Sequence, residues 1–313
     1  MTQHYKGEIG EFDYDDKEYC IGESANGENL YYRGNGQNVR LPEGCTSCYY
    51  MFENYELPTI DLSQFDTTGV KDMEGMFSSA SLVSVDISNF DFSSVESITS
   101  MFRNCDFLKS VVFKNANMCN LKHAAALVSG CIELKSIELD WYNVNRIESI
   151  NRMFNKCIEL ESIELPDMYS PNLENMIMMF SHCSRLRSID LSRIDMSNIK
   201  SFRYMFNYCY DLEEIIFPKV KIDASLDLTY LFRNCQSLRT LDLSNLKFSK
   251  ISVMKGTFSQ CIGLESLDIS TVNISEDYIY IKDVFKGVKN LKYLKVGRLP
   301  NTVLEGFKHL EEF

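Results

Sequence analysis

A Met-Phe pair, or a close substitute for it, returns along this chain at almost constant intervals. The first pair is Met51-Phe52 and the last is Val284-Phe285, and successive pairs are 25, 26 or 27 residues apart. A period of this length is typical of a solenoid, in which each repeat is a small unit that can bury its apolar side only against its neighbours. The chain is therefore predicted to consist of about ten stacked coils.

Each repeat contains two hydrophobic patterns in succession. The apolar residues Ile98, Met101 and Cys105 follow one another at spacings of three and four, which places them on one side of a helix. Further along each repeat, apolar and polar residues alternate, as at Ile189 and Leu191, and this is the period of a half-buried strand. The two patterns predict a helix, a tight turn and a short strand in each coil, with the stacked strands forming one long parallel sheet.

The two ends of the chain depart from this pattern. Residues 1–45 contain short alternating segments separated by Gly and Asn, and we predict a small N-terminal β cap there. A cap is expected because the open end of a solenoid exposes its core. Residues 46–313 are predicted to form the solenoid together with a C-terminal cap. The predicted fold class is thus α/β, a right-handed solenoid of about ten coils with one long parallel β-sheet.

Two segments show the repeat most clearly, "MFENYELPTIDLSQFDTTGV" from Met51 and "MFSHCSRLRSIDLSRIDMSNI" from Met179. In them the chain resembles the BspA-like leucine-rich repeat proteins, a group of bacterial surface proteins, and the resemblance covers most of the sequence. The segment from Leu30 to Phe52 is similar to the short β lead-in that such proteins place before their first repeat. The resemblance implies a leucine-rich-repeat solenoid with an adhesive or interaction role at the cell surface.

Composition and charge narrow the classes of partner. The 313 residues are 45% hydrophobic, enough for a large core, and the net charge of −12 disfavours nucleic acids and anionic membranes. The sequence has no apolar run of about 18 residues, so no membrane insertion is expected. Its first residues lack the apolar segment of a signal peptide, which predicts a cytoplasmic location. If a leader is missing, the resemblance implies a secreted or surface location instead. We expect a monomer.

Cysteines also follow the repeat. Stacking brings one thiol per coil into a single column, which would suit inter-coil disulfides, bound metal ions or simple packing. Packing is favoured because the same slot holds Tyr55, Ala80 and Val288 in other coils, and cysteine is commonly a small buried residue. Cys45 and Cys48 form one C-x-x-C pair, but a structural zinc site usually needs a second pair. We therefore predict neither a metal nor a cofactor. The column contains Cys105, Cys131, Cys157, Cys183, Cys209, Cys235 and Cys261.

Catalytic motifs are scarce in this sequence. The four histidines lie far apart, and the sequence contains no phosphate-binding glycine loop, nucleophile elbow or HExxH segment. His182 precedes Cys183, so a Cys/His pair is conceivable, but the equivalent positions hold the residue types of an exposed turn. Carboxylates are numerous enough for a glycosidase pair, yet they are spread along a regular surface. The prediction is that the protein is not an enzyme.

The outward strand residues point to a binding surface instead. Seven of the ten are acidic, and Glu138, Glu164 and Asp190 are consecutive in the column. A neighbouring column that includes Arg187 alternates in sign, which predicts ion pairs between coils. These columns form either an ordinary soluble surface or a surface that binds a partner.

Trp141 is the only tryptophan. It aligns with polar residues of the other coils and is therefore predicted to be exposed, with Tyr142 pointing inward. The alternative is that Trp141 packs over the edge of the sheet. An exposed tryptophan beside acidic residues is typical of an interface hot spot. The sequence thus predicts a module that binds a protein, or less plausibly a glycan. The alternatives are a structural spacer, a surface adhesin and, with least support, a carbohydrate-active enzyme. The predicted partner-binding residues are Glu138, Trp141, Glu164, Arg187 and Asp190.

Overall fold

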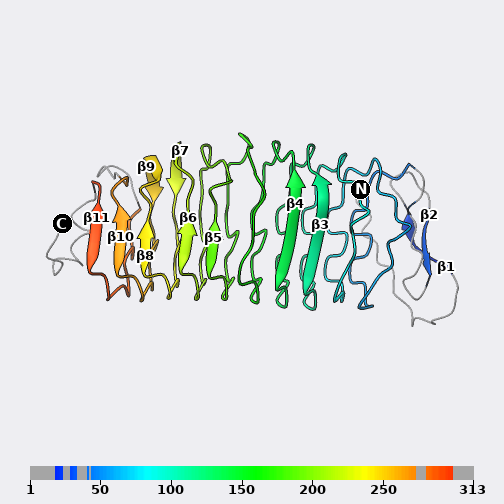
Figure 1. The fold of residues 1–313 in the computed structure, drawn as a ribbon, viewed down its shortest axis with the longest axis horizontal. Helices are drawn as coiled ribbons and strands as arrows, with labels where there is room; N and C mark the ends of the chain where they lie inside the picture. Colours follow the sequence, from blue (N-terminus) through cyan, green and yellow to red (C-terminus); the bar gives the residue numbers. More distant parts are fainter. Residues whose placement is uncertain (1–17, 24–28, 34–40, 42–43, 273–279, 299–313) are drawn as a thin grey trace.

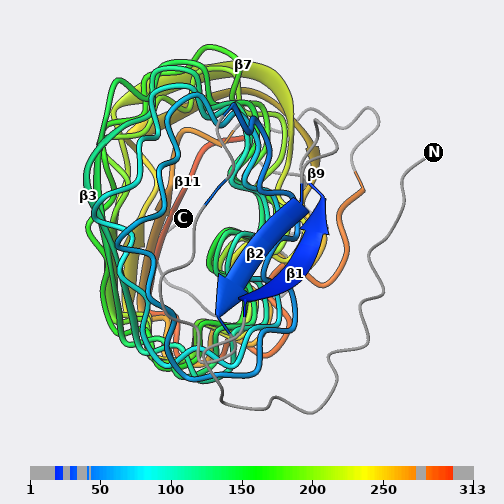
Figure 2. The same cartoon turned by 90° about the vertical axis from the view of Figure 1, so that its right-hand side faces the viewer.

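The computed structural model describes residues 18–23, 29–33, 41, 44–272 and 280–298. These residues form an elongated solenoid whose coils follow one another along its long axis (Figure 1). Seen along that axis the coils largely superpose, with β3 and β11 on the same side of the cross-section (Figure 2). Most of the predicted C-terminal cap, which begins near residue 296, and much of the predicted N-terminal cap lie outside the described residues. The domain boundary at residue 45 stays a prediction.

Short parallel strands form one side of the solenoid. β3 pairs with β4, β5 with β6, and β8, β10 and β11 form a three-stranded sheet, while β7 and β9 make a separate pair. All of these pairs are parallel, and among the described strands β1 and β2 alone pair in antiparallel fashion. The predicted parallel pairing is therefore confirmed, but the single long sheet is replaced by several short ones. The strands are β1 (Glu18–Glu23), β2 (Asn29–Arg33), β3 (Ser110–Asn117), β4 (Ser136–Tyr142), β5 (Ser188–Asp190), β6 (Glu214–Ile216), β7 (Val220–Asp227), β8 (Thr240–Asp242), β9 (Leu246–Val253), β10 (Ser266–Ile269) and β11 (Tyr293–Val296).

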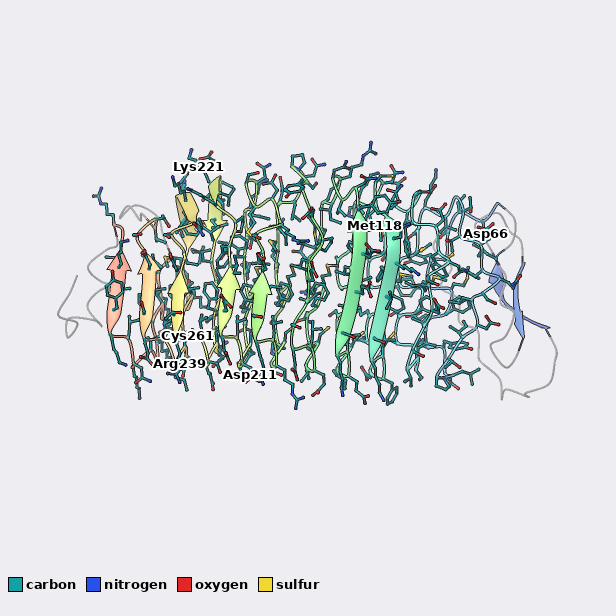
Figure 3. The ribbon with its side chains drawn as sticks, viewed as in Figure 1. Asp66, Met118, Asp211, Lys221, Arg239 and Cys261 are labelled. Carbon is teal, nitrogen blue, oxygen red and sulfur yellow. The ribbon has the colours of Figure 1, made fainter. Side chains whose placement is uncertain are left out.

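The inward strand residues predicted from the alternating pattern lie in the core. Ile189 and Leu191, for example, are 2% and 0% exposed. Charged side chains cover the outside of the coils, with Lys221 at one long edge and Arg239 and Asp211 at the other (Figure 3). The described part of the chain contains no helix of the length and hydrophobicity needed to cross a membrane.

The segments predicted to be helical form hydrogen-bonded turns. Within the described residues no helix occurs, so the helical half of the α/β prediction is not confirmed. The count of ten coils and the right-handed winding stay predictions. The stripe itself is buried as expected, since Ile98, Met101 and Cys105 are each 0% exposed. We call these stacked turns, such as residues 98–105 and 176–183, the turn ladder.

Hydrogen bonds between coils explain why the turn ladder is not helical. In the turn at 176–183, alternate N–H groups donate to the next coil, as from Phe180 to the carbonyl of Met205 at 2.9 Å. The N–H groups between them close local turns, as from Cys183 to Phe180 at 3.1 Å. A helix would keep all of these bonds within one segment. Sharing them between local turns and the next coil ties each coil directly to its neighbour.

Two residues in each turn have left-handed backbone conformations. In one coil these are Tyr204, with φ of 57°, and Tyr208, with φ of 63°. Such a conformation costs a residue other than glycine about 1–2 kcal/mol and interrupts a right-handed helix. It turns the chain so that Met205 and Phe206, which lie between the two tyrosines, point into the core, where each is 0% exposed.

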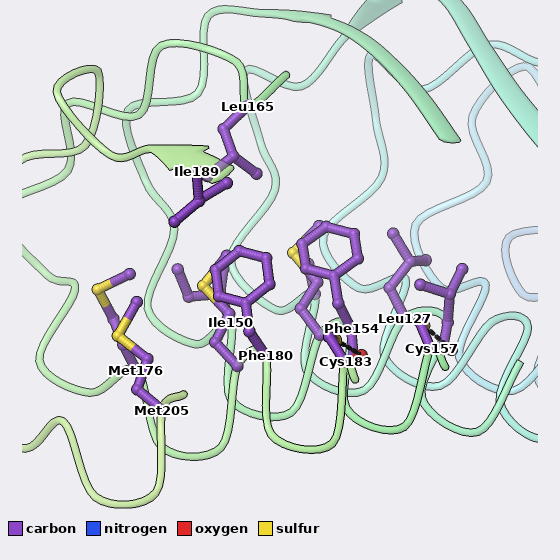
Figure 4. Packing of buried hydrophobic residues seen from close by; sticks show 14 of the residues in the cluster. Leu127, Ile150, Phe154, Cys157, Leu165, Met176, Phe180, Cys183, Ile189 and Met205 are labelled. Atoms are coloured by element: carbon purple, nitrogen blue, oxygen red, sulfur yellow. Dashed lines mark hydrogen bonds between the residues drawn. The ribbon is translucent and has the colours of Figure 1, made fainter. Parts of the chain in front are cut away.

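Phenylalanine rings and thiols fill the inner side of the turn ladder. Phe154 and Phe180 stack with ring centroids 5.3 Å apart, and both point across the core toward Leu165 and Ile189 (Figure 4). The Cys183 thiol donates to the carbonyl oxygen of Phe154 at 3.0 Å. The same oxygen accepts the backbone N–H of Cys157 within its own turn. The Cys183 thiol therefore binds the second lone pair of this carbonyl.

The same thiol bond recurs in every coil of the cysteine column. It measures 2.9 to 3.2 Å at Cys105, Cys131, Cys157, Cys209, Cys235 and Cys261. All seven cysteines of the column are buried, as the packing interpretation predicts.

Burial makes this column a source of alkaline instability. Burial raises the pKa of the Cys183 and Cys261 thiols from an ordinary value of 9.0 to about 12. Above pH 9 the unfolded thiol therefore loses its proton while the folded thiol keeps it, so the free energy of unfolding falls as pH rises toward 12. The fall is about 1.4 kcal/mol per pH unit for each such thiol.

We predict that Cys183→Ala/Cys261→Ala reduces this alkaline slope by about 2.8 kcal/mol per pH unit, twice the value for one thiol. Urea unfolding of both proteins at several pH values between about 7 and 11 measures the difference. Below pH 8 the two slopes should match, because both thiols are then protonated in either state. Equal slopes above pH 9 would show that these thiols are not buried as described.

Candidate functional site

The predicted partner-binding residues lie on the outer side of the strands, which we call the strand face. Glu138, Glu164, Arg187 and Asp190 are all exposed there. The acidic residues Glu138, Glu164 and Asp190 occupy equivalent positions in three successive coils. The same column holds an exposed aliphatic residue at each end of this acidic run, Val112 at 42% and Ile216 at 44% exposure.

A shallow hollow of about 270 Å³ opens within this acidic run. Arg193 contributes a positive charge to it, with Nη1 3.4 Å from Oε1 of Glu164 and Nε 3.9 Å from Oδ1 of Asp167. Hydrogen bonds from Ser192 hold the pKa of Asp190 below its usual value, so this carboxylate stays charged near neutral pH. The hollow is lined by Ser162, Ile163, Glu164, Leu165, Ser188, Asp190 and Arg193.

The hollow exists because the strand side is open at this coil. The N–H of Arg187 donates to the carbonyl of Glu161 at 3.0 Å, and the next bond to the following coil joins Met168 to Arg193 at 2.9 Å. Residues 162–167, which lie between Glu161 and Met168, form no backbone hydrogen bond to either neighbouring coil in the described chain. Pro166 has no N–H to donate, which prevents a regular strand ladder here.

Ion pairs between coils are present in only part of the column where alternating charges predicted them. Glu265 accepts from Arg239 at 3.1 Å and from Lys292 at 2.6 Å, as expected. Arg187 was predicted to join this alternation, but in the described structure its side chain forms no ion pair. Its guanidinium is therefore an exposed and unneutralised charge beside the acidic run.

Trp141 is buried, so its predicted exposure is wrong. It is 6% exposed, and its ring meets Phe113 edge-on with centroids 5.5 Å apart. The reason is the length of β4, which continues to Tyr142 with regular alternation of buried and exposed residues. Aligning Trp141 with the turn residues of shorter strands placed it on the wrong side. Tyr142, predicted to point inward, is 42% exposed.

The indole of Trp141 has an unusual feature for a buried side chain. Its Nε1 donor is buried without any hydrogen-bond partner. Leaving a buried donor unsatisfied costs about 1–3 kcal/mol. Trp141 thus belongs to the core beneath the strand face, where it supports the face from below instead of contacting a partner directly.

The structure separates the one Cys/His pair that the sequence brings together. His182 Nδ1 lies 2.9 Å from the Ser181 hydroxyl, and its ring stacks on Tyr208 at 4.7 Å. The Cys183 thiol points into the core, so the histidine cannot activate it. Cys45 and Cys48 are buried, and the Cys45 thiol donates to the carbonyl oxygen of Ser47 at 3.2 Å. Within the described residues, no three His, Cys, Asp or Glu side chains are grouped to hold a metal ion.

Two family models match the chain and together span most of the solenoid. The family described as "Mycoplasma protein of unknown function, DUF285" matches residues 43–136 and 119–236, more than half of the sequence. The family described as "BspA type Leucine rich repeat region (6 copies)" matches residues 204–305. No curated protein matches the sequence.

Several solved structures resemble the chain over most of its length at low sequence identity. An internalin from Listeria monocytogenes is 15% identical with a TM-score of 0.35, over 88% of this chain and 70% of its own. A leucine-rich cell surface protein from Faecalibacterium prausnitzii is 15% identical with a TM-score of 0.31, over 92% and 97%. The mouse RP105/MD-1 complex is 17% identical with a TM-score of 0.37, over 88% of this chain and 44% of its own. Likeness at this level carries no conclusion about function.

We predict opposite outcomes for two replacements of Trp141. Trp141→Ala should lower the free energy of unfolding by about 3–5 kcal/mol, because it empties a buried site. Trp141→Phe keeps an aromatic ring and removes the unpartnered donor, so its loss should stay below about 1.5 kcal/mol. Urea unfolding measures both variants. A loss below about 1 kcal/mol for the alanine variant would restore the prediction that Trp141 is exposed.

Proposed function

We propose that this chain, which belongs to the DUF285 family and carries BspA-type leucine-rich repeats, is a non-enzymatic module that binds a protein on its strand face. Leucine-rich repeats suit protein binding because their stacked coils present long, regular surfaces. The predicted binding residues Glu138, Glu164, Arg187 and Asp190 remain the proposed site, with Trp141 supporting it from below.

One observation carries this proposal. Three consecutive carboxylates are bracketed in the same column by Val112 and Ile216, each more than 40% exposed. Single exposed aliphatic side chains are common on protein surfaces, so what sets this column apart is that they lie at both ends of one acidic run. An interface uses such side chains as apolar anchors and the surrounding charges for orientation and association rate.

The charge of the acidic run indicates what kind of partner it fits. Glu138, Glu164 and Asp190 are each exposed, and coil stacking places them about 5 Å apart. Like charges at this spacing repel one another, and a basic partner segment would relieve that repulsion. Arg187 and Arg193 lie beside the run and would limit which basic segments fit.

A structural spacer is the second candidate. It is favoured by the regularity of the turn ladder, where stacked phenylalanines lie 5.2 to 5.8 Å apart from coil to coil. A glycan ligand or a carbohydrate-active site has less support, because the Glu164 side chain that lines the hollow is 82% exposed. Such exposure does not provide the enclosed environment that raises the pKa of a catalytic acid.

The location and assembly state belong to this proposal as well. The BspA-type repeats support a surface-associated or secreted protein, with a cytoplasmic location as the alternative. We propose that the module acts as a monomer, because its strand face needs no second copy to be complete.

Site-specific photo-cross-linking tests the strand face directly. A photoreactive residue at position 112 or 216 should cross-link one protein from the surface fraction of the source organism. Ile132 and Ile262 are the matched control positions, since they are aliphatic, 40% and 43% exposed, and lie outside the strand column. Equal cross-linking at all four positions, or none at 112 and 216, would favour the spacer.

Carboxylate variants then test the acidic run. We predict that Glu164→Gln/Asp190→Asn weakens binding of the cross-linked partner at least tenfold, about 1.4 kcal/mol. Asp242→Asn is the control, because Asp242 makes the same local contact as Asp190. Asp242 accepts the N–H of Ser244 at 2.7 Å, and Asp190 accepts the N–H of Ser192 at 2.8 Å. It should bind within about twofold of wild type. Similar losses for both variants in surface plasmon resonance would place the interface elsewhere.

A further inference from the structure

The C-terminal half of the turn ladder carries a basic and aromatic surface, which we call the turn face. The turns 175–182, 201–208, 227–234, 253–260 and 280–287 contain five Lys and Arg residues and two carboxylates, although the whole chain has a net charge of −12. One of these carboxylates, Asp227, lies 3.6 Å from Nε of Arg203 and neutralises it. The turn face contains His182, Arg203, Tyr204, Tyr208, Tyr230, Arg233, Lys255 and Tyr280.

Two cations of the turn face each lie near the rings of two tyrosines. The guanidinium carbon of Arg233 lies 5.3 Å from the ring centroid of Tyr208 and 5.0 Å from that of Tyr230. The ammonium of Lys255 lies 5.4 Å from the Tyr230 centroid and 5.9 Å from that of Tyr280. Neither cation forms an ion pair in the part of the chain that the structure describes. The rings fix their positions and leave their N–H groups available.

The backbone supports this arrangement at a cost. Tyr204, Tyr208 and Tyr230 all have positive φ, at positions where glycine or asparagine would be less strained. The Tyr230 ring covers Gly256 so closely that a Cβ there would lie 2.3 Å from the ring. Bulky residues that persist in strained conformations are a reason to look for a function.

Another tyrosine ring of the turn ladder also covers a glycine, but it has no lysine at the equivalent position. The Tyr50 ring covers Gly75 in the same way, with a hypothetical Cβ 2.5 Å away. The residue before Gly75 is Glu74, whereas the residue before Gly256 is Lys255. The rings thus serve packing in both places, whereas a cation precedes the glycine only in the second of these two pairs.

We propose that the turn face binds an acidic segment of a partner protein through that segment's carboxylates. A guanidinium presents a planar pair of donors that matches a carboxylate, and Lys255 adds a second positive charge beside the same ring. Charge complementarity favours such a partner, because neither Arg233 nor Lys255 forms an ion pair with any carboxylate among the described residues.

Other ligand classes fit this surface less well. A sugar ring would need a free aromatic face, but Tyr208 is stacked by His182 at 4.7 Å and Tyr230 is covered by Tyr204 at 5.2 Å. The net charge of −12 opposes a nucleic acid at longer range. A protein segment needs only the exposed donors and ring edges that remain.

This surface is separate from the strand face. The turn ladder and the strands lie on opposite sides of the core, as Phe180 and Ile189 illustrate (Figure 4). A partner on one side does not cover the other. The protein therefore has an acidic face for a basic segment and a basic face for an acidic one.

Fluorescence polarisation with a labelled peptide of alternating glutamate and glycine tests the proposal, with a glutamine-glycine peptide as the neutral probe. Arg233→Gln/Lys255→Gln should weaken binding of the acidic peptide at least tenfold. The matched control is Arg239→Gln/Lys292→Gln, which removes two exposed cations that pair with Glu265 elsewhere. The control should stay within about twofold, and Glu164→Gln/Asp190→Asn should also leave peptide binding unchanged.

Several outcomes would overturn the proposal. Equal losses in both double variants would indicate general charge attraction, and equal binding of the two peptides would exclude carboxylate recognition. Heparin binding that depends on Arg233 and Lys255, without binding of the glutamate peptide, would assign the surface to an anionic glycan. Should the double variant fail to fold in thermal unfolding, Lys255→Gln alone must still weaken binding at least threefold.

Discussion

The hydrogen bonds between successive turns are the interaction on which the rest of this structure depends. Alternate N–H groups of each turn donate to the carbonyls of the next coil, as from Phe180 to Met205 and from His182 to Asn207. These bonds fix the spacing at which the phenylalanine rings stack and at which each buried thiol meets a carbonyl of the preceding coil. The repeated cysteine therefore adds a side-chain bond to the backbone connection between coils, as from the Cys183 thiol to the carbonyl of Phe154.

This connection also turns sequence columns into surfaces. Residues one repeat apart become neighbours, so a bias at one position of the repeat becomes a charged stripe on the molecule. On the strand face the stripe is acidic at Glu138, Glu164 and Asp190, and on the turn face it becomes basic at Arg233 and Lys255. The two faces are the basis of two proposed interactions of opposite charge. Single residues that break the repeat shape both faces. On the strand face, Pro166 interrupts the strand ladder at the hollow, and on the turn face, Gly256 leaves space for the Tyr230 ring.

The sequence predicted which residues are buried far better than which backbone they adopt. Spacings of three and four correctly placed Ile98, Met101 and Cys105 in the core, but a turn with left-handed residues produces the same spacing as a helix. The positive φ angles at Tyr204 and Tyr208 could not be predicted from the residue type, because tyrosine rarely adopts them. Trp141 was misplaced because strand length varies between coils, and a one-residue shift in a strand reverses the side on which a residue lies. The hollow beside Arg193 depends on hydrogen bonds missing from the strand side, which spacing alone does not reveal.

Hydrogen exchange of the turn amides tests the central claim most directly. The account predicts that the amides of Phe180 and His182, which donate to the next coil, exchange as slowly as those of Leu139 within β4 and as slowly as global unfolding allows. Their protection should be lost together with that of neighbouring coils as the solenoid opens. Rapid exchange at Phe180 and His182 with protected strands, or a circular dichroism spectrum dominated by α-helix, would contradict a turn ladder bonded from coil to coil.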